Sequence, residues 1–235
     1  MKIIFATGNA NKLKEIREIM GDISDEILSM KEAGVYADPE ENGTTFRENA
    51  LIKARACAVK AHGICGPGET ILVMADDSGL EIDALGGEPG IYSARYLGHE
   101  TSYDEKNSVI LERLKDVPEN ERTARFVCAV ACVIVRGAGD EPGLSDDGTA
   151  DVSGLSATAA ADAADDKSFV TCETMEGRIA YEIAGANGFG YDPIFFLPEY
   201  GKTSAEISPE EKNAISHRGK ALRAMRKVLK DELGS

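Results

Sequence analysis

The distribution of apolar and polar residues along the chain predicts a mixed α/β protein. The runs KIIFA at 2–6 and ILVMA at 71–75 are short and continuously apolar, which is typical of buried strands. RFVCAVACVIV at 125–135 is longer and rich in β-branched residues, so it should form a central strand. In residues 11–20 the apolar positions recur at helical spacing, which predicts an amphipathic helix.

Capping signals predict where further helices begin. Thr45 and Glu48 have the spacing of a capping box. The helix that they open should end at about His62, before Gly63. Further helices are expected from the Ser102–Glu105 capping box to about Lys115, at Ser208–Pro209, and from about Ser216 to Leu233.

Two glycine-containing segments predict turns. Asp76–Gly79 should end the strand at 71–75, because Asp, Ser and Gly are good turn residues. Glu176–Gly177 separates two strand-like segments and is typical of a hairpin. The mixture of strands and helices indicates an α/β fold with one long, twisted, mixed sheet flanked by helices.

Length and composition suit a single soluble domain. The chain has 235 residues, of which 43% are hydrophobic, enough for one large domain or two fused lobes. No apolar run approaches the ~20 residues that span a bilayer, and the chain begins with a strand-like segment, so we expect an intracellular protein without membrane contact. The five cysteines have no zinc-site spacing and should be reduced thiols; for Cys128 and Cys132 core packing is favoured over metal ligation.

The formal charge of −15 argues against nucleic-acid partners, which need clustered Lys and Arg. It leaves room for a small polyanion bound by a local positive pocket and a divalent cation. Residues 137–166 hold eight carboxylates and no Lys or Arg. We interpret them as an exposed, mobile, acidic low-complexity insertion, with an acidic interaction tail as the alternative.

The segment after the first strand carries a candidate anion site. It consists of Thr7, Gly8, Asn9, Ala10, Asn11 and Lys12. Backbone N–H groups at the start of a helix attract phosphate, and Lys12 adds a positive charge. An ordinary strand-to-helix turn with a capping Asn is the alternative.

Asp76 and Asp77 form a candidate acidic site. Two consecutive carboxylates at a strand end are costly unless they meet a cation or hydrogen-bond donors. Oxygen ligands suit Mg²⁺, and a carboxylate can also help to deprotonate an attacking water. A polar β-turn is the alternative. Acids in the 38–42 loop could add a metal ligand or merely keep the loop soluble, and Lys53 could point at phosphate or at solvent.

Two later segments suggest a nucleoside pocket. In Gly188–Asp192 the flanking glycines leave Phe189 free to stack on a base, or the segment is a bulge with a core phenylalanine. Lys212, His217 and Arg218 provide possible donors across a helix boundary, with Ser216 as its N-cap.

Together these segments closely resemble the inosine triphosphate pyrophosphatase family, the XTP/dITP diphosphatases. The matches span nearly the whole chain: FATGNANKLKE, EENGTTFRENALIKARA, ADDSGLEIDALGGEPGIYSARY, GFGYDPIFF and EKNAISHRGKAL. The resemblance implies a single domain of two lobes over residues 1–235 with a central cleft, a cytoplasmic homodimer, and Mg²⁺-dependent hydrolysis of ITP, dITP or XTP to the monophosphate and pyrophosphate.

The resemblance also implies roles for matching residues. Asp77 should be the general base and a metal ligand beside Asp76, and Glu41, or its neighbour Glu40, should complete the Mg²⁺ site. Lys53 should be a further catalytic residue near the phosphates. Those expected to contact the substrate are Thr7, Gly8, Asn9, Ala10, Asn11, Lys12, Ser78, Phe189, Gly190, Tyr191, Asp192, Lys212, His217 and Arg218. The segment 137–166 is longer than the family pattern. A pyrophosphatase for other modified nucleotides and a nucleotide sensor without turnover are the alternatives; a water-activating carboxylate counts against the sensor.

Overall fold

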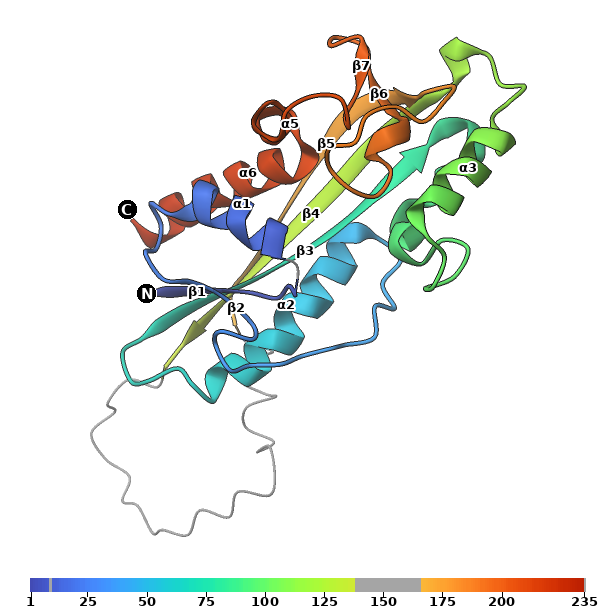
Figure 1. The fold of residues 1–235 in the computed structure, drawn as a ribbon. Coiled ribbons are helices and arrows are strands. Elements are labelled where there is room, and N and C mark those ends of the chain that lie inside the picture. Colours follow the sequence, from blue (N-terminus) through green and yellow to red (C-terminus); the bar gives the residue numbers. More distant parts are fainter. Residues whose placement is uncertain (9, 138–165, 235) are drawn as a thin grey trace.

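The strands form one mixed sheet in the computed structural model, which describes residues 1–8, 10–137 and 166–234 (Figure 1). They are β1 (Lys2–Phe5), β2 (Ile27–Ser29), β3 (Thr70–Ile82), β4 (Thr123–Arg136), β5 (Ser168–Ile179), β6 (Phe195–Leu197) and β7 (Lys202–Thr203). Within the described residues the order is β2-β1-β3-β4-β5-β6-β7. β1 pairs in parallel with β2 and β3, and the later pairs are antiparallel. The predicted mixed sheet flanked by helices is confirmed.

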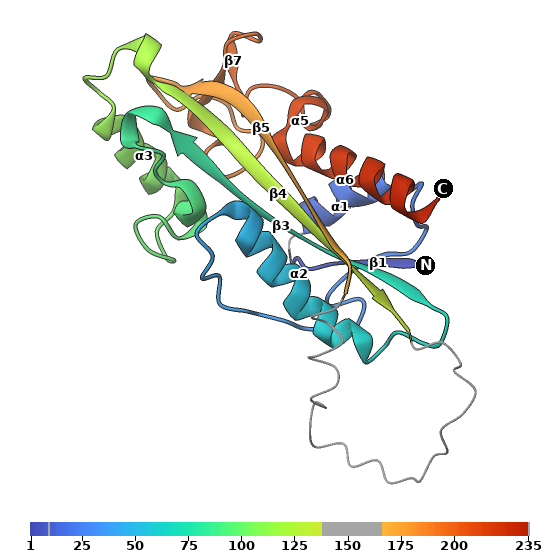
Figure 2. The same ribbon diagram turned by 180° about the vertical axis from the view of Figure 1, so that it is seen from behind.

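Helices cover both faces of this sheet. They are α1 (Ala10–Met20), α2 (Phe46–His62), α3 (Tyr103–Arg113), α5 (Pro209–Ile215) and α6 (His217–Leu233), with short 3₁₀ turns that include η2 (Gly90–Arg95) and η4 (Asp192–Ile194). Figures 1 and 2 show α1 and α6 together on one face and α2 on the other. Alternation along β3 explains both layers: Leu72 and Met74 pack in the core beneath α1 and α6, while Ile71 and Val73 pack beneath α2. A third core cluster, around Leu80, lies toward α3.

The predicted helix starts are confirmed by their capping hydrogen bonds. Glu48 N donates to Thr45 Oγ1 at 3.1 Å, and Thr45 N donates back to Glu48 Oε2 at 3.1 Å. Ser102 caps α3, Ser208 caps α5 in a second capping box, and Ser216 caps α6. These side chains satisfy backbone N–H groups that have no partner inside the helix, so they fix where each helix begins.

The two predicted turns at glycines are wrong. β3 continues through Asp76–Gly79 to Ile82, and β5 continues through Glu176–Gly177 to Ile179. Each glycine instead permits a close approach by another segment. A Cβ on Gly79 would lie 2.3 Å from the carbonyl oxygen of Gly90, and one on Gly177 would lie 2.6 Å from that of Phe196. A strand glycine can mark a close backbone contact as well as a turn.

The predictions drawn from composition have different outcomes. Cys128 and Cys132 are buried in the core, where burial raises each thiol pKa to about 12, so the packing interpretation is confirmed. The acidic insertion at 137–166 lies outside the described residues, apart from its end residues Gly137 and Asp166. Among the helices of the described residues, none has the length and apolar character needed to cross a membrane.

Candidate active site

Asp76 and Asp77 lie in the middle of β3, just past the end of its pairing with β1. That pairing runs as far as Phe5 and Met74, so β1 gives way to its loop where the two aspartates begin. Consecutive strand residues point to opposite faces of a sheet. Asp76 therefore faces α1 and α6, and Asp77 faces α2, which the ion pairs of the two carboxylates confirm.

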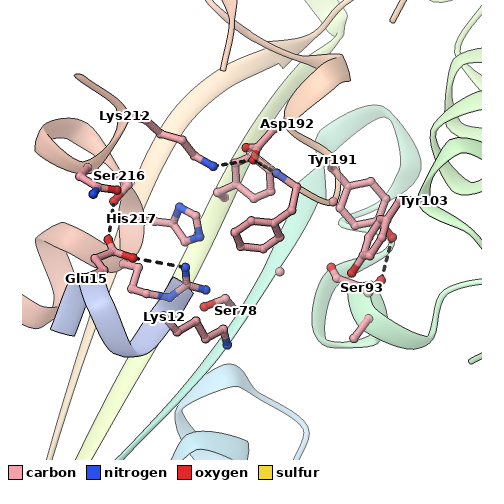
Figure 3. Close-up of a pocket in the computed structure, with 17 residues that line it drawn as sticks. Lys12, Glu15, Ser78, Ser93, Tyr103, Tyr191, Asp192, Lys212, Ser216 and His217 are labelled. Carbon is pink, nitrogen blue, oxygen red and sulfur yellow. Dashed lines mark hydrogen bonds and ion pairs between the residues drawn. The ribbon is translucent and has the colours of Figure 1, made fainter. Parts of the chain in front are cut away.

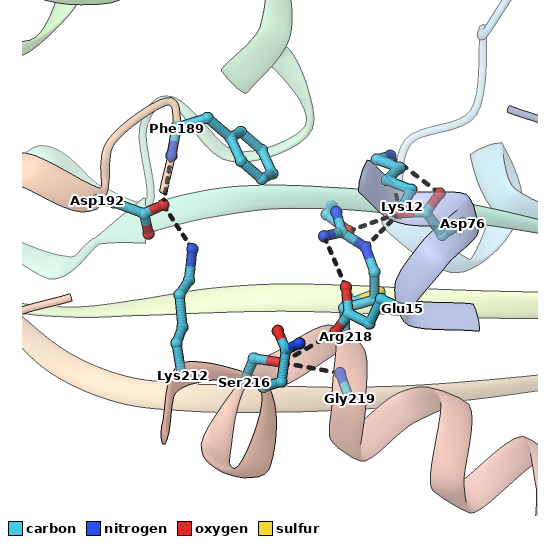
Figure 4. A network of polar contacts seen from close by, with 12 residues as sticks. Lys12, Glu15, Asp76, Phe189, Asp192, Lys212, Ser216, Arg218 and Gly219 are labelled. Carbon is cyan, nitrogen blue, oxygen red and sulfur yellow. Dashed lines mark hydrogen bonds and ion pairs between the residues drawn. The ribbon is translucent and has the colours of Figure 1, made fainter. Parts of the chain in front are cut away.

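The Asp76 carboxylate is buried and fully hydrogen-bonded (Figure 4). Lys12 Nζ donates to both of its oxygens, at 3.0 and 2.9 Å, and Arg218 Nε donates to Oδ2 at 3.1 Å. Ser78 Oγ donates to the same oxygen at 3.2 Å. Burial acts to raise the pKa of Asp76, but Lys12 and Arg218 outweigh it and hold the pKa well below the ordinary value. Asp76 is thus ionised and ties two cations together.

Glu15 supports Arg218 from the other side. Its Oε2 lies 3.6 Å from Arg218 Nη1, and Ser216 Oγ lies 3.4 Å from its Oε1. Burial raises the pKa of Glu15, against the lowering effect of Arg218. The sequence reasoning missed Glu15, although it stands three residues after Lys12 and therefore on the same face of α1.

The Asp77 carboxylate has one bonded oxygen and one without a hydrogen bond. Lys53 Nζ donates to Asp77 Oδ1 at 2.8 Å and lies 3.4 Å from Glu41 Oε1. Asp77 Oδ2 is buried and makes no hydrogen bond within the described residues. Burial raises the pKa of Asp77, although Lys53 acts to lower it. Glu40 is exposed and does not reach this group, so the geometry favours Glu41.

A small polar cavity of about 210 Å³ lies beside this acidic pair. Thr7, Gly8, Lys12, Glu41, Lys53 and Asp76 are among its lining residues. Of the other residues in the predicted anion site, Ala10 and Asn11 form the first turn of α1, and Asn9 lies outside the described residues. The cavity therefore brings three residues of the predicted anion site together with Lys53, Glu41 and Asp76, and Lys12 and Lys53 reach it from opposite faces of the sheet.

The acidic side has donors that suit a hard cation. Glu41 and Asp77 offer carboxylate oxygens, and the buried Asp77 Oδ2 has unused acceptor capacity. Lys53 lies between the two acids, and in the described part of the chain no cluster of three or more His, Cys, Asp or Glu side chains is arranged to hold a metal. The chemistry of these donors fits a hard cation such as Mg²⁺, which Glu41 and Asp77 could hold.

A second cavity, of about 350 Å³, adjoins the first at Lys12 (Figure 3). Phe189 lies on its rim with 50% of its surface exposed. Lys212 Nζ is 5.2 Å from the centre of the Phe189 ring, and Arg218 Cζ is 6.0 Å from it. A flat apolar ring with two cations beside it can hold a planar group that carries hydrogen-bond acceptors.

His217 lines the same cavity as a neutral imidazole. Its ring stacks on Phe126, with centroids 4.9 Å apart and planes 13° apart. Burial, followed by the charges of Arg218 and Lys212, lowers the pKa of His217 well below its ordinary value. Its Nδ1 atom is buried without a hydrogen bond in the described residues, so this nitrogen has unused hydrogen-bonding capacity.

Asp192 and Tyr191 line the cavity, but their polar atoms bind other parts of the protein. Asp192 accepts hydrogen bonds from Phe189 N at 2.8 Å, Ser204 Oγ at 2.8 Å and Lys212 Nζ at 2.5 Å. Tyr191 donates its hydroxyl to the carbonyl oxygen of Ser93 at 2.7 Å. The two residues thus fix the turn that presents Phe189. In this turn Gly188 and Gly190 have φ values of +77° and +71°, which glycine adopts most readily.

The structure also adds lining residues that the sequence analysis did not select: Ser93, Ala94, Tyr103, Phe126 and Asn213. Phe126 lies in an apolar strand, so its sequence context predicts a core residue. Ser93 and Ala94 lie in a 3₁₀ turn, and no local sequence pattern predicts where that turn packs. Tyr103 follows the N-cap of α3 and looks like surface. Their placement depends on tertiary contacts.

These two adjoining cavities define a site for a small phosphorylated molecule that carries a planar group, and comparison with known proteins supports this class. The chain matches the Ham1 family model over residues 3–228. It is 43% identical to the dITP/XTP pyrophosphatase of Clostridium perfringens, over 97% of each chain, and 41% identical to that of Escherichia coli K12, over 98% of each.

Solved structures match the chain as well. The HAM1 protein structure from Coxiella burnetii aligns with a TM-score of 0.74 at 36% identity, covering 98% of this chain and 99% of that one. The Staphylococcus aureus Ham1 structure aligns at 0.72 and 34%, covering 99% and 100%. The chain belongs to the Ham1 family.

Proposed function

We propose that this protein hydrolyses nucleoside triphosphates of non-standard purines, namely ITP, dITP and XTP, to the monophosphate and pyrophosphate. One observation carries the proposal: Lys12 and Arg218 pair with Asp76, and Lys53 pairs with Asp77, beside a polar cavity that adjoins an aromatic one at Lys12. Relatives that match over nearly the full length are named dITP/XTP pyrophosphatases. A triphosphate would occupy the polar cavity, and its nucleoside the aromatic one.

At the phosphate end, residues 7–12 and Lys53 bind the triphosphate and offset its charge. Asp77 accepts a proton from the water that attacks the α-phosphorus, and pyrophosphate leaves in line. Asp76 holds Lys12 and Arg218 in place. Mg²⁺, held by Glu41 and Asp77, would supply further charge neutralisation at the substrate phosphates.

At the nucleoside end, the base stacks on Phe189 and the surrounding cations donate to its 6-keto oxygen. Lys212 and Arg218 are the charged donors, while neutral His217 offers a ring nitrogen, and Ser78 contacts the substrate beside them. Adenine has an amino group at the 6-position, so donors would face a donor. ATP should therefore be rejected by unpaired polar groups as well as by lost contacts.

Product analysis tests this proposal. The purified protein is incubated with Mg²⁺ and ITP, dITP, XTP, GTP or ATP, and phosphate is measured with and without added inorganic pyrophosphatase. We expect ITP, dITP and XTP to yield phosphate when the coupling enzyme is present, and ATP to be a poor substrate. Phosphate release without coupling would indicate γ-phosphate cleavage. Binding of ITP without any cleavage would establish the nucleotide sensor instead.

We further propose that the enzyme is a cytoplasmic homodimer, an inference that the family resemblance supports. Light scattering of the purified protein measures its mass directly. A mass of twice 25.1 kDa is expected, and a monomer at high concentration would contradict the dimer.

A further inference from the structure

Helix α3 lies behind the wall of the nucleoside cavity that faces Lys212 and His217. Figure 3 shows Ser93, Tyr103 and Tyr191 together on this wall, with Lys212 and His217 on the opposite side. The wall combines three segments that are distant in sequence: η2, the first residue of α3, and the Gly190–Tyr191 turn. Their separation decides how wide the cavity is at the position assigned to the base.

Lys106 on α3 binds the first of these segments. Its Nζ donates to the carbonyl oxygen of Ala94 in η2 at 2.8 Å and lies 4.7 Å from the centre of the Tyr103 ring. Lys106 is 1% exposed, which is unusual for a lysine. Removing an amino group from water is unfavourable. The burial of Lys106 against η2 therefore indicates that this lysine does more than pack α3 against the rest of the protein.

Asn107, the next residue, binds the second segment. Its Nδ2 donates to the carbonyl oxygen of Gly190 at 3.1 Å, and the side chain is 1% exposed. Its Oδ1 is buried without a hydrogen bond among the described residues, so half of this amide is desolvated without compensation. A residue that served packing alone would be better replaced by an apolar side chain of the same size.

Direct contacts also join the segments of the wall to one another. Tyr191 donates its hydroxyl to Ser93 O at 2.7 Å, and its ring meets the edge of Tyr103 with centroids 5.2 Å apart. The two segments that α3 binds are therefore also bound to each other. Two adjacent residues of one helix thus fix the cavity wall at two points.

We propose that Lys106 and Asn107 are positioning residues that set the spacing of the nucleoside cavity and, through Gly190, the place of the Phe189 ring. The proposal rests on the assignment of this cavity to the nucleoside in the proposed function. Neither residue touches the phosphate end, so their effect should fall on recognition of the nucleoside.

The test compares variants in ITP hydrolysis and in inhibition. Asn107→Leu keeps the volume and removes both the hydrogen bond and the buried unpaired oxygen, and Asn107→Asp keeps the shape but removes the donor. For each, KM for ITP should rise about tenfold with kcat within about twofold, in line with loss of one orienting hydrogen bond. Inhibition by inosine should weaken by a similar factor, and inhibition by inorganic tripolyphosphate should not change. Lys106→Met should act in the same way, and Lys106→Arg should restore KM.

Two further variants make the result decisive. Ser108 lies on the exposed face of α3, so Ser108→Ala should leave KM, kcat and both inhibition constants unchanged. Phe189→Ala reports on the cavity assignment itself. If Phe189→Ala raises KM while the Asn107 variants do not, the positioning proposal fails and the cavity assignment stands. If neither changes KM, both fail. A loss of melting temperature in Asn107→Leu with unchanged KM would show a role in stability alone and would also overturn the proposal.

Discussion

Asp76 and Asp77 are neighbours in one strand, yet the structure gives them opposite surroundings. Both oxygens of Asp76 are hydrogen-bonded, and Lys12 and Arg218 hold its pKa low. Asp77 has a buried oxygen without a hydrogen bond in the described residues, and burial raises its pKa. Because adjacent strand residues face opposite sides of a sheet, a single dipeptide can supply a structural anchor to one layer and a reactive carboxylate to the other.

The largest effect should follow from Asp77→Asn. We expect kcat for ITP to fall about 10³-fold, because general-base catalysis contributes on the order of 10²–10⁴. The melting temperature should change little, because removing a carboxylate whose pKa is raised by burial offsets the loss of its ion pair with Lys53, which Glu41 still contacts. Steady-state kinetics and a thermal melt measure the two quantities. A kcat near that of the wild type would remove Asp77 from the chemistry.

Asp76→Asn should instead destabilise the protein. The variant leaves Lys12 and Arg218 without their shared counter-charge, and breaking a buried ion pair costs about 3 kcal/mol or more. Denaturant unfolding measures this loss near neutral pH. The low pKa of Asp76 means that its stabilisation is present above about pH 3.9, the unfolded value, and is lost as pH falls below it. The difference in free energy of unfolding between variant and wild type should therefore shrink in acid. A difference that grew as pH fell would contradict the conclusion that Asp76 is ionised.

Phe189→Ala should affect recognition more than chemistry. Base–aromatic stacking is worth about 1–3 kcal/mol, so KM for ITP should rise about tenfold or more, with a smaller change in kcat. Tyr200→Ala, at another exposed aromatic residue, is the matched control and should behave as the wild type. An unchanged KM in Phe189→Ala would exclude the ring from the base site.

The smallest effect concerns His217 and pH. Because the folded pKa of His217 is lowered, the unfolded chain takes up a proton below about pH 6.5 that the folded protein does not. Stability is therefore lost as pH falls below that value, by about 1.4 kcal/mol per unit from this group. In His217→Gln the loss should be smaller by that amount. Denaturant unfolding at pH 7.5 and 5.5 measures the difference, and an equal loss of stability in both proteins would mean that folding does not lower the pKa of His217.

The sequence predicts the elements whose signals are local. Thr45, Ser102, Ser208 and Ser216 cap helices where their spacing indicates, and the apolar run at 125–135 is a buried strand. The family motifs also name residues that the fold brings together, because Lys12 and Arg218 pair with Asp76 and Lys53 pairs with Asp77; their roles stay predictions. The predictions of helix starts and strands succeed because capping and periodicity are properties of neighbouring residues.

What the sequence does not predict depends on distant contacts. Gly79 and Gly177 have the composition of turns, but each lies inside a strand because another segment packs against its backbone. Nor does the dipeptide at 76–77 reveal that its two carboxylates belong to different layers, which follows from the continuation of β3 through it. Glu15, Lys106 and Asn107 act on residues that the fold alone brings near them.

The different roles of Asp76 and Asp77 are tested most directly by the binding of a non-hydrolysable ITP analogue to the Asp77→Asn and Asp76→Asn variants. Calorimetry with α,β-methylene-ITP in the presence of EDTA reports the contribution of the side chains alone. Asp77→Asn should bind with a dissociation constant close to that of the wild type, or lower, while Asp76→Asn should bind at least about tenfold more weakly because its cations lose their anchor. Equal losses in both variants, or a loss confined to Asp77→Asn, would contradict the account.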